Sequence, residues 1–193
     1  MALLEMLQQR LGGDVVHQIS SRLGADPGTT GNAIDAALPL LLGAMARNNA
    51  SGQNAQALAN AVSKDHDGSI LDDVQGYVSR GDTSTGSGIL GHILGGRQQT
   101  VQNGLSQTTG LEPGKVGQLL TMLAPLVMGA VGRTTRDNKL DAGGLSTMLT
   151  GEHEHLKQSA PGVMGALGRF LDHDNDGSVM DDVGGMLGKA FGR

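Results

Sequence analysis

Residues 19–47 (ISSRLGADPGTTGNAIDAALPLLLGAMAR) and residues 105–133 (LSQTTGLEPGKVGQLLTMLAPLVMGAVGR) align without a gap, at an offset of 105 − 19 = 86 residues. The identical positions include several glycines and prolines, which chance rarely aligns so consistently. They are Gly24 and Gly110, Pro27 and Pro113, Gly31 and Gly117, Pro39 and Pro125, Gly43 and Gly129, and Arg47 and Arg133. We infer an internal duplication.

Each copy has the pattern of a short helix, a turn and a longer helix. Gly24 and Gly110 are typical C-terminal stops. The Asp-Pro-Gly or Glu-Pro-Gly that follows makes a turn, with proline tolerated in the first turn of the next helix. In that helix the apolar residues share one face: Ile34, Leu38, Leu41 and Met45, and then Leu120, Ala124, Val127 and Val131. Pro39 and Pro125 predict a kink, either to wrap the helix around a core or to form a hinge or groove.

Composition favours an all-α protein. The 193 residues include one Tyr, two Phe and no Trp, so the core must be aliphatic. Glycine is abundant, at 32 residues, which predicts short helices with many joints. We expect two related multi-helix units: residues 1–80, a Gly/Ser-rich joint at 81–99 with a short helix near 89–94, and residues 100–193. An extra helix within 151–171 would account for a 23-residue insertion in the second unit.

An acidic loop accompanies each unit. Residues 172–178 (DHDNDGS) match the first half of an EF-hand loop, in which alternate carboxylates converge on one hard cation and glycine permits the bend. The predicted calcium ligands there are Asp172, Asp174, Asp176, Ser178, Asp181 and Asp182. Val183 stands where an EF-hand has its bidentate Glu, so we expect weak binding. The loop in the first unit is poorer, because Ser63 holds its first position; its candidate ligands are Asp65, Asp67, Ser69, Asp72 and Asp73.

The same residues of the two acidic loops can also be explained as helix caps. Ser69 with Asp72, and Ser178 with Asp181, fit the capping box that starts a helix. Carboxylates in a first helical turn also favour the helix dipole. The sequence is compatible with both interpretations, calcium binding and helix capping, at each loop.

Other classes of function have little support. The net charge is −5 without a basic run, so nucleic-acid binding is an alternative by fold analogy only. No cysteine is present, which excludes disulfides and thiolate catalysis. The longest apolar runs are about half of the ~20 residues that span a bilayer, and no signal peptide is evident, so we expect a cytoplasmic protein. The Gly-x-Gly-x-x-Gly at 86–91 lacks a βαβ frame, and His153 and His155 have no third ligand of clear spacing.

The chain resembles the YidB-like bacterial proteins, grouped in the domain-of-unknown-function family numbered 937. The resemblance lies in AIDAALPLLLGAMARN (33–48), GSGILGHILGGRQQTV (86–101), MLAPLVMGAVGR (122–133) and FLDHDNDGSVMDDVGGMLG (170–188). It implies a helical fold, with homeodomain-like three-helix packing in the units, and no activity. We therefore expect a non-enzymatic binding or interaction protein whose partner is another protein or a second copy, steadied by calcium. The alternatives are a nucleic-acid-associated protein and an enzyme with an unrecognised polar cleft.

Overall fold

The computed structural model describes residues 2–49, 52–81, 83–163 and 165, and within them it shows helices and no strands, which confirms the all-α prediction there. The α-helices are α1 (Leu3–Arg10), α2 (Gly13–Leu23), α3 (Pro27–Asn48), α4 (Gly52–Lys64), α5 (Val74–Arg80), α6 (Ser84–Leu94), α7 (Gln98–Thr109), α8 (Pro113–Asp137) and α9 (Ala142–Ser159). Two short 3-10 turns, η1 (Ser69–Asp72) and η2 (Gly95–Arg97), lie between them.

The helix ends and helix starts predicted for the duplicated stretch are confirmed. Gly24 ends α2 and Gly110 ends α7, both in the left-handed conformation at φ of 59° and 77°, where a side chain would be strained. Pro27 and Pro113 each occupy the first turn of the following helix. Asp26 adds a cap, accepting a hydrogen bond from the amide of Thr29 at 2.8 Å.

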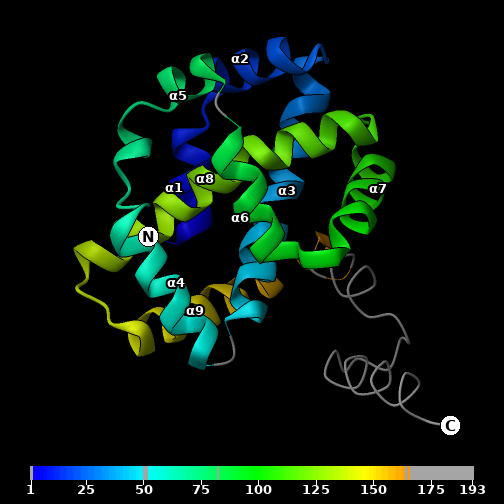
Figure 1. The fold of residues 1–193 in the computed structure, drawn as a ribbon. Helices are drawn as coiled ribbons and strands as arrows, with labels where there is room; N and C mark the ends of the chain where they lie inside the picture. Colours follow the sequence, from blue (N-terminus) through cyan, green and yellow to red (C-terminus); the bar gives the residue numbers. More distant parts are fainter. Residues whose placement is uncertain (1, 50–51, 82, 164, 166–193) are drawn as a thin grey trace, which may run out of the picture.

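The longer helices of the two copies, α3 and α8, form the centre of the molecule (Figure 1). Their middle turns are buried almost all round, and both helices continue through their internal proline, at Pro39 and Pro125. In the described part of the chain, α8 alone is long and apolar enough to cross a membrane by length and composition. Because 72% of its most apolar window is buried inside the fold, α8 has the burial of a core helix.

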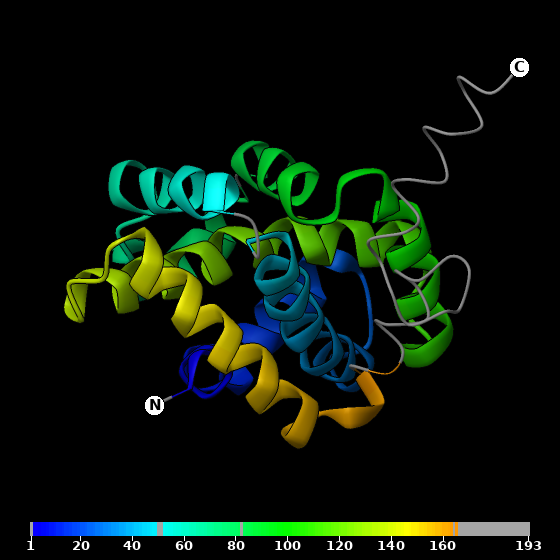
Figure 2. The same ribbon diagram turned by 90° about the horizontal axis from the view of Figure 1, so that it is seen from below.

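The two halves interleave. The helix after the first copy, α4, packs on α8 of the second copy, and α9 packs on α3 of the first. In the same way α1 and α6, which precede the copies, each contact both central helices. Figure 2 shows α9 running beside α3. The homeodomain-like packing implied by the resemblance is therefore not confirmed, because α3 and α8 each pack on helices from both halves of the chain.

The glycine-rich segment contains a packed helix. A helix near residues 89–94 was expected, and α6 begins earlier, at Ser84. Gly86 lies against the backbone of Thr121 in α8, so closely that an added Cβ would overlap the Thr121 carbonyl oxygen. Glycine here permits close approach of two helices, and Ile89, Leu90 and Leu94 fill the core beside it.

The second half differs from the first after its long helix. At the duplication offset, the end of α4 at Lys64 corresponds to residue 150, but α9 continues to Ser159. Residues 151–159 of the expected insertion therefore belong to α9, and residues 161–163 and 165 are helical again after the break at Ala160. The added turns carry Glu152, which is only 8% exposed and accepts hydrogen bonds from the amides of Leu3 and Leu4 at 3.1 and 3.0 Å. This carboxylate caps α1 and ties α9 to the N-terminal end of the chain.

Candidate functional site

In the first acidic loop, most of the candidate ligands serve local structure. Asp67 accepts a hydrogen bond from the amide of Ser69 at 2.9 Å, at the start of η1. Asp73 caps α5 by accepting from the amide of Gly76 at 2.8 Å. Asp72 forms an ion pair with Arg133, and Asp65 lies exposed at the end of α4. These carboxylates thus point to separate partners. Asp73 caps α5 and Asp67 closes the turn before η1, whereas η1 has no side-chain cap and the expected box of Ser69 with Asp72 is not formed.

Arg133 holds this loop on α8. Its guanidinium, whose side chain is only 15% exposed, donates to the carbonyl oxygen of Gly68 at 2.7 Å as well as pairing with Asp72. The loop lies so close to α8 that a Cβ at Gly132 would overlap the His66 carbonyl oxygen. Because this contact and the ion pair fix both ends of the turn, they place the His66 side chain beside α4.

The fuller calcium-type loop, with Asp172, Asp174, Asp176, Ser178, Asp181 and Asp182, lies outside the described residues. Within the described part of the chain, no three His, Asp or Glu side chains lie together as a metal site. Calcium binding at either loop stays a prediction.

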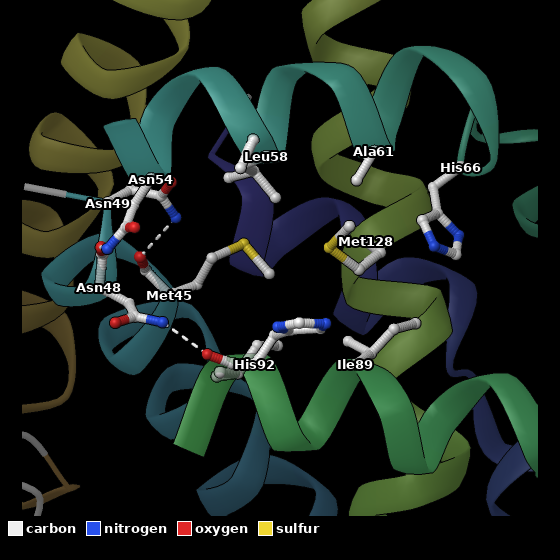
Figure 3. A pocket seen from close by; sticks show the side chains of 12 residues that line it. Met45, Asn48, Asn49, Asn54, Leu58, Ala61, His66, Ile89, His92 and Met128 are labelled. Carbon is white, nitrogen blue, oxygen red and sulfur yellow. Dashed lines mark hydrogen bonds between the residues drawn. The ribbon is translucent and has the colours of Figure 1, made fainter. Parts of the chain in front are cut away.

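A pocket of about 250 Å³ opens beside His66, between α4 and α6 (Figure 3). Met45 of α3 and Met128 of α8 are both buried and lie on opposite sides of it, with their sulfur atoms facing its middle. Apolar side chains of α4 and α6 complete the walls: Ala57, Leu58, Ala61, Ile89 and Ile93. The site is therefore assembled from both copies of the duplicated unit.

One end of the pocket is built from three asparagines. The side-chain amide of Asn48 donates to the backbone carbonyl of His92, and that of Asn54 donates to the carbonyl of Asn48 at 2.7 Å. The Asn49 amide nitrogen donates to the Met45 carbonyl at 2.9 Å. These bonds join the end of α3 to α4 and α6, so that the polar end has a fixed geometry.

Asn49 carries an uncommitted acceptor. Its side chain is 6% exposed, and its Oδ1 is buried without a hydrogen-bond partner in the described part of the structure. The bond from Nδ2 to the Met45 carbonyl fixes the amide orientation, because a flipped amide would place oxygen against oxygen. A buried acceptor without a partner costs about 1–3 kcal/mol. Because this oxygen has almost no solvent-accessible surface, it does not face the open space of the pocket.

Two histidines lie along the rest of the pocket. His92 is exposed on α6, whereas His66 is half-buried. Burial lowers the pKa of the His66 imidazole below its ordinary value of 6.5, and the nearby Asp65 carboxylate opposes that shift. At neutral pH the His66 ring is therefore uncharged, able to donate from one nitrogen and accept at the other.

Comparison with known protein families identifies the family of this chain. The family described as bacterial protein of unknown function, DUF937, matches residues 5–134. The chain belongs to this family. No curated protein and no solved structure matches the chain. Every residue that lines the pocket lies inside the DUF937 match, whereas α9 and residues 172–182 lie beyond it.

Sequence reasoning missed the pocket of this DUF937 protein because its residues come from four helices. Met45 was assigned correctly to a core face, but that pattern does not distinguish a packed methionine from one beside a cavity. The one sequence feature that pointed to the polar end of the pocket was the pair of asparagines at 48 and 49. Polar residues directly after a long apolar helix are typical of the C-terminal end of that helix. Glu152 was also missed, because its partners lie about 150 residues away along the chain.

Proposed function

We propose that this DUF937 protein is a non-enzymatic binding protein, and that its ligand site is the pocket between α4 and α6. The observation that carries the proposal is a pocket with a methionine-lined middle, a polar end and walls from both copies of the duplicated unit. Ligand sites of this kind combine mainly apolar walls with a few fixed polar groups. Methionine suits such a wall, because its flexible, polarisable side chain adapts to different shapes.

The chemistry of the pocket favours binding over catalysis. Its lining consists of Met, Leu, Ile, Ala, Asn and His, with no carboxylate, hydroxyl or thiol side chain among the described residues that form it. A nucleophile with an adjacent base would need at least one of those groups in reach of a histidine. The fixed asparagine amides instead supply orientation without chemical reactivity.

The pocket is tested by NMR titration of isotope-labelled protein with two compact neutral probes, indole and indene. We expect saturable shifts of the methyl signals of Met45 and Met128 with at least one probe. Ala61→Leu should abolish these shifts by filling the pocket, whereas Ser63→Leu, on the exposed side of the same helix, should leave them intact. If neither probe shifts the two methionines, or if Ala61→Leu binds like the original protein, the pocket is not a ligand site.

Calcium binding by the loop at Asp172 is a second proposal, independent of the pocket. The spacing of Asp172, Asp174 and Asp176 before Gly177 supports it. Nucleic-acid binding gains no support from the acidic net charge of −5.

A further inference from the structure

We infer that the end of α3 around Arg47 is a docking surface for the C-terminal acidic segment, residues 177–187 of the same chain. The segment docks there as residues 68–78 dock on α8, with an ion pair between Arg47 and Asp181. This docking is independent of the pocket and of calcium. It is supported by the contacts that the first copy makes with α8, because the residues on both sides of that interface recur in the sequence.

On α8, the docked turn is held by an arginine and a glycine. The Arg133 guanidinium donates to the Gly68 carbonyl at 2.7 Å and pairs with Asp72. Beside this pair, Ile70 lies so close to Gly129 that an added Cβ would overlap the Ile70 side chain. The helix that receives the turn therefore needs an arginine for the ion pair and, four residues earlier, a residue without a side chain.

Both receiving residues recur on α3. At the duplication offset of 86 residues, Arg47 corresponds to Arg133, and Gly43 corresponds to Gly129. Arg47 and Arg133 are both partly exposed, so a surface segment can reach either of them. Because glycine weakens a helix interior relative to alanine, its presence at Gly43 favours a close neighbour at that point of α3.

The residues that dock recur as well, at the offset of 109 residues. Gly177 corresponds to Gly68, whose φ of 93° favours glycine. Asp181 corresponds to Asp72, the partner of the arginine. An apolar residue also stands at each position that the first copy buries: Met180 for Leu71, Val183 for Val74, Met186 for Tyr77 and Leu187 for Val78. The segment thus carries an apolar face that needs a receiving surface.

The helix cap of the first copy recurs in the same segment. Asp73 caps α5 by accepting from the Gly76 amide at 2.8 Å, and Asp182 precedes Gly185 by the same three residues. Asp181 in the ion pair and Asp182 in the cap are therefore both committed to structure. A cation at this loop is left with the carboxylates that precede Gly177: Asp172, Asp174 and Asp176.

The chain after α9 can reach this surface. Helix α9 packs on α3 and ends at Ser159, and Val163 packs against the core just after it. The 18 residues from Ser159 to Gly177 (177 − 159 = 18) span up to about 60 Å when extended. The 23-residue insertion therefore does not prevent the segment from returning to Arg47.

One counterpart differs between the two surfaces. Ala46 stands where α8 has Gly132, and a Cβ at Gly132 would overlap the His66 carbonyl oxygen. The second loop therefore does not repeat the approach that the His66 backbone makes to α8. The two arrangements correspond only from Gly177 onward.

A double-mutant cycle on the full chain tests the ion pair. Arg47→Gln and Asp181→Asn should each lower the melting temperature, and the double variant should melt no lower than the less stable single variant. The reference cycle, Arg133→Gln with Asp72→Asn, should show the same non-additivity, because that pair is formed in the structure.

NMR spectra locate the contact. Arg47→Gln should shift the amide resonances of Gly177 and Ser178. The matched control is Arg10→Gln, at the exposed end of α1, which should leave both resonances in place.

The outcomes are distinct. Additive losses in melting temperature, or an unchanged Gly177 resonance in Arg47→Gln, would overturn the docking. Non-additive losses in a protein that sediments as a dimer would place the segment of a second copy on α3 and overturn the intramolecular arrangement. If a single variant does not fold, the charge reversal Arg47→Asp with Asp181→Arg decides: recovery of melting temperature relative to Arg47→Asp supports the docking, and no recovery overturns it.

Discussion

Glu152 is predicted to be one of the most sensitive polar positions in the fold. Its carboxylate is 8% exposed and accepts two backbone amides from the first turn of α1. Hydrogen bonds to charged groups contribute about 1.5–3 kcal/mol each, and removing the acceptor leaves two amide donors without a partner. Taking the lower value for each bond, Glu152→Ala should reduce the free energy of unfolding by about 3 kcal/mol.

The conservative variant separates charge from packing. Glu152→Gln keeps one acceptor oxygen and the side-chain volume, but it turns an NH2 group toward a backbone N–H. We expect a loss of about 1.5 kcal/mol, between that of Glu152→Ala and the original protein. The matched control is Glu154→Gln on the same helix, where an exposed carboxylate pairs with Lys157 at 2.8 Å. That exposed ion pair should change stability by less than about 0.5 kcal/mol.

Urea unfolding followed by circular dichroism measures these differences, and a thermal melt should show Glu152→Ala about 6–12 °C below the original protein. The amide resonances of Leu3 and Leu4 give a local check, since both should shift in Glu152→Ala and stay in place in Glu154→Gln. The reasoning is refuted if Glu152→Ala unfolds within about 0.5 kcal/mol of the control, because the two amides would then be equally well satisfied by water.

Three further predictions address the first acidic loop, pH and calcium. Gly132→Ala should cost about 1–3 kcal/mol in urea unfolding, because its Cβ would meet the His66 carbonyl, whereas Gly114→Ala in open space on the same helix should be neutral. Stability should fall as pH drops from 7 to 5, because His66 has a pKa lowered from 6.5 by burial and the unfolded chain binds the proton more readily; a pH series of melts on His66→Gln should show a shallower slope. Calcium titration should shift the amide resonance of Gly177 and raise the melting temperature, and Asp174→Asn should abolish both effects; no response in the original protein would contradict calcium binding.

The local signals in the sequence predicted the structure well where they depended on neighbouring residues. Gly24, Pro27, Gly110 and Pro113 marked helix ends and starts correctly, because φ restrictions and capping act within one turn. The apolar face of each long helix was likewise correct. These rules need no knowledge of the partner helix.

The features that the sequence did not predict all involve distant partners. Gly86, in the segment predicted as a glycine-rich joint, contacts the backbone of α8, and its local sequence does not reveal this contact. His66 is half-buried where its loop approaches Gly132, and the sequence of the loop alone does not reveal this contact. The pocket combines residues from α3, α4, α6 and α8, so no single helix pattern contained it.

The interleaving of the halves has a consequence for synthesis on the ribosome. Helix α3 is completed by α8 and α9, and the first turn of α1 receives its cap from Glu152. The N-terminal half therefore leaves the ribosome before the helices that cover it have been translated. Its apolar face stays uncovered until most of the chain has been translated. Contacts between residues far apart in the sequence therefore limit the rate of folding, and the nascent half depends on protection from aggregation.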